Sequence, residues 1–220
     1  MTNNNTTGRR SSLLTATSIC RIHEAALHIL EPVARLVNLA CVAPWSVDVV
    51  AASSIEALDR EEGLLTVPGV GGGSVEIALS FESAAAVVKA MDGRVAGPIL
   101  VDHHGAPMRA DEEARDFVAE LMWHVDPSTA DIPWTFRSLR ESVFADMIDG
   151  GVEIHIAAAQ AGLGWGGPPT DRFDRIYHQR ACAEWWAWHI GVLPPPALAH
   201  SSTACGGRGT ILGRRPTTML

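Results

Sequence analysis

The chain has 220 residues and a hydrophobic fraction of 47%, which suits one domain with a sizeable core. Its formal net charge is −8, and residues 19–190 contain all 25 acidic side chains and 12 of the 17 cations, a net charge of −13. A surface of that sign repels phosphate backbones, so we expect no nucleic-acid binding.

The two ends differ in composition from the body. Residues 1–16 are rich in Asn, Thr and Ser, and residues 191–220 contain three consecutive prolines and many small polar side chains. Both compositions predict disordered tails, which leaves a single domain over residues 17–190. The tails contain arginine and no acid, and we interpret them as solvated ends. Their arginines are Arg9, Arg10, Arg208, Arg214 and Arg215.

The first part of the domain predicts helices and short strands. Apolar residues recur at helical spacing from Ile19 to Ala40, and Pro32 is expected to kink this helix or to begin a second one. Strands are predicted over residues 46–52 and 64–67. A short helix that begins at the capping-box sequence after residue 52 would lie between them.

Residues 75–101 predict a strand, a helix and a second strand. The strand 75–81 alternates apolar and polar residues, a helix capped by Ser83 follows it, and residues 98–101 would form the next strand. This stretch resembles the closing half of an RNA-recognition motif, which implies a ferredoxin-like βαβ arrangement. Apart from Phe81, the strand lacks the stacking aromatics of that family, so the resemblance implies the topology without RNA binding.

The rest of the domain predicts two helices and a hairpin. The helix 110–123 has acidic residues in its first turn. Residues 143–148 and 152–157 flank an Asp-Gly dipeptide, which is the strongest short signal for a β-hairpin. The last helix is rich in tryptophan; it begins at a cap at Asp171, or one residue earlier, and ends near Ile190.

These elements together predict an α+β fold. A small mixed sheet contains the ferredoxin-like βαβ portion and the β-hairpin. The sheet packs against the N-terminal helix, the central helix 110–123 and the C-terminal Trp-rich helix.

A polar string follows the predicted strand 98–101. Asp102, His103 and His104 stand where open α/β sheets place ligands, and Asp and His side chains bind Mn, Mg or Zn. The string resembles the Asp-His-His motif of the DHH phosphoesterase family, metal-dependent enzymes that cleave phosphoester and phosphoanhydride bonds. The resemblance implies a small metal-dependent hydrolase centred on these three residues.

The ligand set is incomplete by comparison with that family. The family supplies further aspartates from an upstream Asp-x-Asp motif, whereas Asp48 is a lone upstream candidate here. His124 and Asp126 end the helix 110–123, so they are the residues that would meet Asp102 and its neighbours in a looser divalent metal site. The hydrolase is the alternative hypothesis for function.

The favoured hypothesis is a non-catalytic protein-binding or regulatory module. The sequence contains no complete catalytic set, and the body is acidic. Trp165 stands in a glycine-rich loop, where an exposed indole would anchor a partner. A tryptophan folded back to cover the core is the competing interpretation. We expect a protein partner or a homo-oligomer, and no cofactor beyond the possible divalent metal.

The composition also indicates a compartment. The four cysteines are far apart and form no CxxC pair, which is typical of reduced thiols in a cytoplasm. The apolar run 25–42 includes charged residues, so no membrane span is expected. Nearly all cations are arginine and alanine is abundant, as in GC-rich genomes, so we expect a bacterial cytoplasmic protein.

Overall fold

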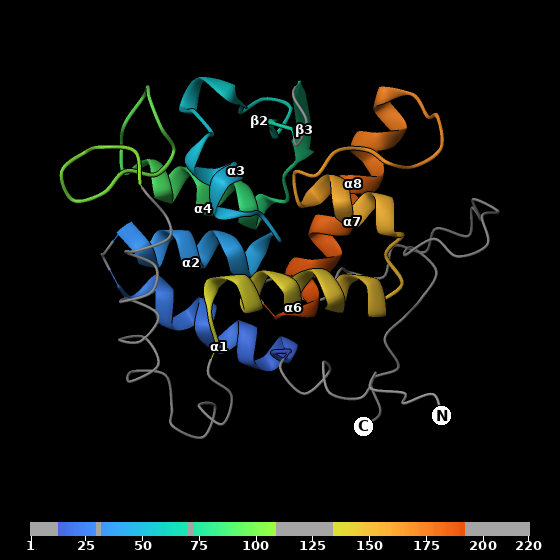
Figure 1. The fold of residues 1–220 in the computed structure, drawn as a ribbon, viewed down its shortest axis with the longest axis horizontal. Coiled ribbons are helices and arrows are strands. Elements are labelled where there is room, and N and C mark those ends of the chain that lie inside the picture. The colour runs from blue at the N-terminus through green and yellow to red at the C-terminus, as the bar shows by residue number, and fades with distance from the viewer. Residues whose placement is uncertain (1–12, 30–31, 70–72, 109–133, 192–220) are drawn as a thin grey trace, which may run out of the picture.

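The computed structural model describes residues 13–29, 32–69, 73–108 and 134–191, which form helices and one small sheet (Figure 1). The fold is therefore α+β, as predicted. In chain order the elements are α1 (Ala16–Leu27), α2 (Pro32–Val42), α3 (Val47–Ala51), the 3-10 turn η2 (Ile55–Ala57), β1 (Leu58–Asp59), β2 (Leu64–Pro68), β3 (Ser74–Ala78), α4 (Phe81–Met91), α6 (Phe136–Asp149), α7 (Ile154–Gln160) and α8 (Arg172–His189).

The helix α2 forms the centre of the core. Figure 1 shows it between α1 and α4, and it also contacts α6 and α8. Every side chain from Leu36 to Val42 is buried. A helix that is buried on all sides belongs in the interior, and the remaining helices pack around it. Pro32 begins this second helix, which is one of the two outcomes predicted for it.

The sheet has three strands in the order β1-β2-β3, and both pairs are antiparallel. β2 and β3 pair from Leu64 opposite Ala78 to Pro68 opposite Ser74. The strand predicted at 64–67 is confirmed, and the strand predicted at 75–81 is confirmed as far as Ala78, because the following helix is capped by Ser80 and not by Ser83. β3 stops at Ala78 because the hydroxyl of Ser80 accepts a hydrogen bond from a backbone amide of the next turn at 3.1 Å and so caps α4.

The strand predicted over residues 46–52 is wrong, because this segment forms the short helix α3. The hydroxyl of Ser46 accepts a hydrogen bond from the amide of Val49 at 3.1 Å, which is the N-cap geometry. The helix predicted after it is reduced to the 3-10 turn η2. A local cap therefore overrides the β-propensity of the valines.

The ferredoxin-like βαβ portion is also wrong. Residues 98–101 form no strand, and only isolated bridges join Pro98 to Ser54 and Val101 to Pro107. The guanidinium of Arg94 donates to the carbonyls of Pro98 and of the next residue. These two carbonyls are thus bonded to a side chain, and no continuous strand pairing forms at residues 98–101. The described sheet is antiparallel throughout, not mixed.

The β-hairpin predicted over residues 143–157 is replaced by the helices α6 and α7. The Asp-Gly-Gly sequence forms the turn between them, with Gly150 as the C-cap of α6. At the other end, the side chains of Thr135 and Ser138 form a capping box. Leu139, Val143 and Met147 are buried with a period of four, so the core selects a helix here.

The turn between α6 and α7 packs closely against α8. A Cβ added at Gly150 would lie 2.1 Å from the indole of Trp185, so the backbone and the ring are in direct contact. The same indole stacks on the ring of His189, with centroids 4.8 Å apart and planes 13° apart. His189 Nε2 lies 3.2 Å from Oδ2 of Asp146 on α6. These contacts join the end of α8 to α6.

Several expectations fall outside the described residues. The helix predicted at 110–123 is one, and so are the predictions about residues 1–12 and 192–220. Among the helices that the structure does describe, none combines the length and the apolar character that crossing a membrane requires.

Candidate interaction surface on helix α8

The inner side of α8 is fixed in the core. The helix begins at Asp171, whose carboxylate accepts a hydrogen bond from the Asp174 amide at 2.9 Å, as the sequence predicted. Cys182 and Trp186 are fully buried. The indole Nε1 of Trp186 donates to the carbonyl of Cys41 at 2.8 Å. This carbonyl lies in the last turn of α2, where no helical donor is available to it.

Two buried glutamines join α7 and α8 to the sheet. The Gln160 amide group on α7 donates to the carbonyl of Ala78 at 2.8 Å and to the backbone carbonyl of Gln179 at 2.9 Å. The side-chain oxygen of Gln179 accepts from the amide of Ala78 at 3.1 Å. The backbone amide and carbonyl of Ala78, the last residue of β3, are thus both hydrogen-bonded to glutamine side chains. These bonds fix the position of α8 against the sheet.

The outer side of α8 carries exposed aromatic rings. Phe173 is 79% exposed and Tyr177 is 58% exposed, and Tyr177 is the only tyrosine in the sequence. At 100° per residue, these two positions share a sector of about 80° with three further positions on the side opposite the buried residues. The full set of positions in this outer stripe is Phe173, Tyr177, Ala181, Glu184 and Trp188.

The arginines of α8 are engaged with the body of the protein. The guanidinium of Arg172 forms two-pronged hydrogen bonds with Glu76 on β3, the shortest 2.7 Å long, and these bonds lower the pKa of the Glu76 carboxyl. Arg175 donates to the carbonyl of Thr170 at 3.1 Å, and Arg180 donates to the carbonyl of Glu62. The three guanidinium groups therefore bond to β3, to the chain just before α8 and to the β1–β2 turn, respectively.

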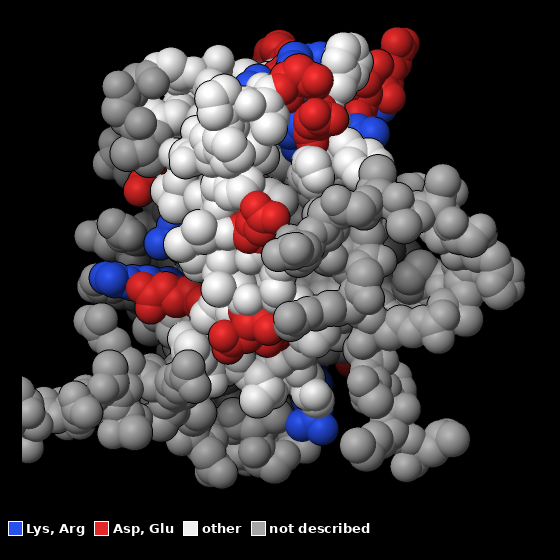
Figure 2. Space-filling view, turned by 90° about the vertical axis from the view of Figure 1, so that its right-hand side faces the viewer, with Lys and Arg blue, Asp and Glu red and all other residues white. Residues whose placement is uncertain are grey.

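The outer stripe therefore has acidic neighbours. Glu184 lies within the stripe and Asp174 beside it, and both are exposed. No ion pair involves either carboxylate among the residues that the structure describes. Figure 2 shows the side of the molecule on which α7 and α8 lie, where some acidic groups stand alone on uncharged surface and others, at the top of the view, lie beside basic groups. The stripe thus combines two exposed aromatic rings with two exposed carboxylates.

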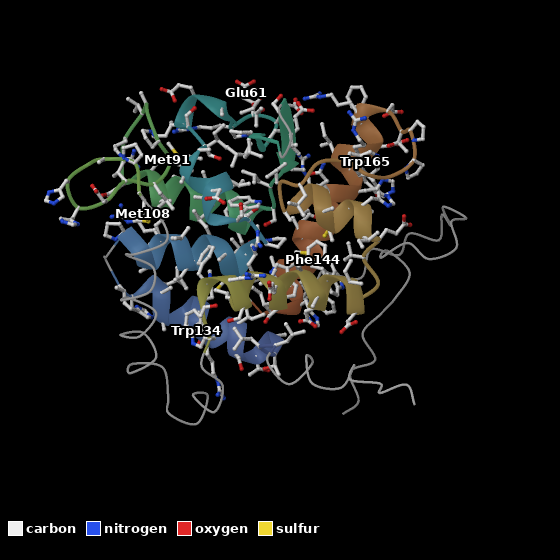
Figure 3. The ribbon with its side chains drawn as sticks, in the orientation of Figure 1. Glu61, Met91, Met108, Trp134, Phe144 and Trp165 are labelled. Carbon is white, nitrogen blue, oxygen red and sulfur yellow. The ribbon has the colours of Figure 1, made fainter. Side chains whose placement is uncertain are left out.

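Trp165 lies in the loop that leads from α7 to α8, at the upper right of the molecule (Figure 3). Its indole is half-buried and packs against the core, and its Nε1 donates to the carbonyl of Pro168 at 2.9 Å. The ring meets the imidazole of His155 edge-on, with centroids 4.7 Å apart. A Cβ at Gly167 would lie 2.4 Å from that imidazole, so only glycine fits at this position of the loop. Trp165 as a partner anchor stays a prediction.

Three of the predicted metal residues, Asp102, His103 and His104, lie in a surface loop after α4. Asp102 Oδ1 accepts hydrogen bonds from the amides of His104 at 2.8 Å and Ala106 at 2.9 Å. Partial burial opposes ionisation of this carboxyl, but the two amides outweigh it and lower its pKa. His103 and His104 are exposed, with ring centroids 3.9 Å apart. The Asp102 carboxylate thus organises its own turn.

The metal site is not assembled by the described residues. No three His, Cys, Asp or Glu side chains converge on a common point in the part of the chain that the structure describes. Asp48 is exposed in the first turn of α3. His124 and Asp126 lie outside the described residues, so the five-residue site and the hydrolase hypothesis stay predictions.

Phe173 and Tyr177 were not among the site residues expected from the sequence. A usable signal was present, because their spacing of four places both rings on one face of the predicted helix. Gln179, Cys182 and Trp186 mark a different face. Aromatic residues on two faces of one helix indicate that a second contact is available beside the core.

Comparisons with known proteins identify a similar fold but no family. No family model matches the sequence, and no curated protein matches it. Among solved structures, the chain is similar to the crystal structure of XerA recombinase, with a TM-score of 0.56 and 17% sequence identity. The match covers 80% of this chain and 64% of that chain, so it spans less than two thirds of the recombinase. At this identity the likeness concerns the fold alone.

Proposed function

We propose that this protein is a non-catalytic binding module that receives a protein partner on the outer face of α8. The observation that carries the proposal is the pair of rings at Phe173 and Tyr177, 79% and 58% exposed on a helix whose opposite side is fixed in the core. An aromatic pair on a rigid support matches the hot-spot composition of protein interfaces.

The two rings are large enough to anchor a complex. A covered aromatic side chain buries about 150–250 Å², which at about 25 cal/mol per Å² is worth roughly 4–6 kcal/mol for a ring that is fully exposed beforehand. Association and side-chain ordering offset part of that gain. Since the buried glutamines and Trp186 already position α8, little further ordering of the helix is required on binding.

The charge around the stripe selects the chemistry of the partner. Asp174 and Glu184 favour a segment that presents apolar residues with basic flanks. In a homodimer through this face, the same carboxylates of the two copies would lie close together. Two bodies of charge −13 would also repel each other, which is unfavourable. A basic amphipathic segment of another protein therefore fits this face better than a homodimer.

Binding of a synthetic basic amphipathic helical peptide tests the proposal. We expect Phe173→Asp or Tyr177→Asp to weaken binding to the whole chain at least about tenfold, or ~1.4 kcal/mol, because each removes an anchor and adds a like charge. Fluorescence anisotropy of the labelled peptide measures this. Val95→Asp is the matched control, since Val95 is 84% exposed outside α8 and should leave binding unchanged. Equal weakening by all three variants, or no binding at all, would contradict the proposal.

A second candidate function rests on the exposure of Tyr177, the only tyrosine in the sequence. In a DNA-joining reaction, the hydroxyl of Tyr177 would attack a DNA phosphodiester, forming a bond from the phenolic oxygen to phosphorus while the sugar oxygen leaves with the phenolic proton. The exposure of the only tyrosine on α8 favours this idea. The engaged arginines and the neighbouring Asp174 oppose it, because phosphoryl transfer needs available cations around the phosphate.

Incubation with nicked duplex DNA separates the two functions. The binding-module proposal predicts that no detergent-resistant protein–DNA adduct forms. Gel electrophoresis of the denatured mixture, with Tyr177→Phe as the control, measures this. An adduct that the wild-type protein forms and Tyr177→Phe does not would establish the DNA reaction and overturn the non-catalytic assignment.

A further inference from the structure

We infer that the C-terminal segment 208–215 of the same chain occupies the outer stripe of α8 when no partner is bound. This inference rests on the proposed function, because it names an internal competitor for the same face. Its basis is the match between the composition of that segment and the chemistry of the stripe, together with the distance that the connecting chain can span.

The segment has the composition that the stripe selects. Residues 208–215 read Arg-Gly-Thr-Ile-Leu-Gly-Arg-Arg, so the apolar pair Ile211 and Leu212 is flanked by three arginines. No acidic residue occurs from position 191 to position 220. On the helix, Phe173 and Tyr177 supply the apolar contact, and Asp174 and Glu184 supply the opposite charge. Apolar residues with basic flanks would thus face two aromatic rings and two carboxylates.

The connection is long enough for the segment to reach these rings. The described chain ends at Gly191, directly after α8, and 17 residues lead from there to Arg208. A chain of that length spans up to about 55–60 Å, whereas the whole of α8 is about 27 Å long. The segment can therefore return along the helix to Phe173 without strain.

Attachment to the same chain favours the segment over a weak external ligand. A short flexible linker gives an effective concentration in the millimolar range, so modest contacts are enough to keep the face occupied. A partner must displace the segment and therefore binds less tightly than to an open face. The C-terminal segment would act as an autoinhibitor that only a stronger basic amphipathic partner overcomes.

A spin label at Cys205 tests the contact in the whole chain. Cys41 and Cys182 are buried, so Cys20→Ser leaves Cys205 as the thiol that the reagent can reach. We expect the label to broaden the NMR signal of the Tyr177 ring, which lies 14 residues before Gly191 on α8, relative to its reduced, diamagnetic form. Ile211→Asp combined with Leu212→Asp should abolish the broadening, and Thr217→Asp, which adds charge beyond the segment, should preserve it.

The outcomes separate this inference from the proposed function. With Ile211→Asp and Leu212→Asp, the synthetic basic peptide should bind about tenfold more tightly, or ~1.4 kcal/mol, because the competitor is removed. An unbroadened Tyr177 signal in the labelled wild-type chain would overturn the inference, and the proposed function would stand if the peptide still bound through Phe173. Failure of the peptide to bind even this variant would overturn the proposed function as well.

Discussion

Replacing Trp186 with alanine should lower the free energy of unfolding by about 3–5 kcal/mol, the usual cost of removing a buried tryptophan. The side chain is fully buried between α8 and the end of α2, and its Nε1 donates to the carbonyl of Cys41 at 2.8 Å. The substitution opens a cavity and also leaves a buried carbonyl without its donor. Urea denaturation followed by circular dichroism measures the change.

Two further variants separate the contribution of the hydrogen bond from that of the buried volume. Trp186→Phe keeps most of the volume but removes the hydrogen bond, so about 1–3 kcal/mol of the loss should remain. Trp188→Ala, on the half-exposed side of the same helix, should cost much less. If Trp186→Ala and Trp188→Ala were equally stable, the placement of α8 against α2 would be incorrect.

Replacing either buried glutamine with leucine should lower the free energy of unfolding by about 1–3 kcal/mol, because each leaves a backbone group of Ala78 without its partner. Gln160→Leu removes the donor to the Ala78 carbonyl, and Gln179→Leu removes the acceptor of the Ala78 amide. Leucine has nearly the same size as glutamine, so packing losses are kept small. Thermal unfolding combined with urea titration gives both values.

The double variant tests whether the two glutamines act together. The amide group of Gln160 also donates to the backbone carbonyl of Gln179, so the two residues share one network. We therefore expect the double variant to lose less than the sum of the single variants. Glu184 is exposed on the same helix, so Glu184→Leu is the control and should leave stability nearly unchanged. Strict additivity would show that the contacts are independent.

Local signals were enough to predict part of the fold. The strand at 64–67 and the cap of α8 at Asp171 follow from alternation and from capping chemistry, both of which act within a few residues. Pro32 was correctly placed at a helix boundary because its missing amide is tolerated in a first turn. These elements depend little on what packs against them.

The missed elements depend on contacts that are distant or ambiguous. An Asp-Gly pair is compatible with a hairpin turn and equally with the end of a helix. The helix forms here because it buries Leu139, Val143 and Met147 in the core. Residues 98–101 are apolar enough for a strand, but Arg94 takes the carbonyls that pairing would need. Sequence periodicity alone does not reveal either outcome.

The interaction surface was predicted only in part, for a similar reason. Trp165 was singled out because glycines flank it, yet the structure places its ring half-buried against His155. Phe173 and Tyr177 are the rings that remain exposed. Their spacing separates their face from that of Trp186, but it does not say which face turns inward. Which face of an aromatic helix turns inward is decided by partners such as Gln160 and Cys41, far away in the sequence.

The contact between Gly150 and Trp185 limits how this protein can change over evolutionary time. Because a methyl group at position 150 would overlap the indole, a larger residue there requires a smaller one at position 185. The loss of Trp185 would in turn remove the ring that stacks on His189. Related sequences should therefore vary at these two positions in concert, so that glycine accompanies tryptophan and bulkier turns accompany a smaller helix residue.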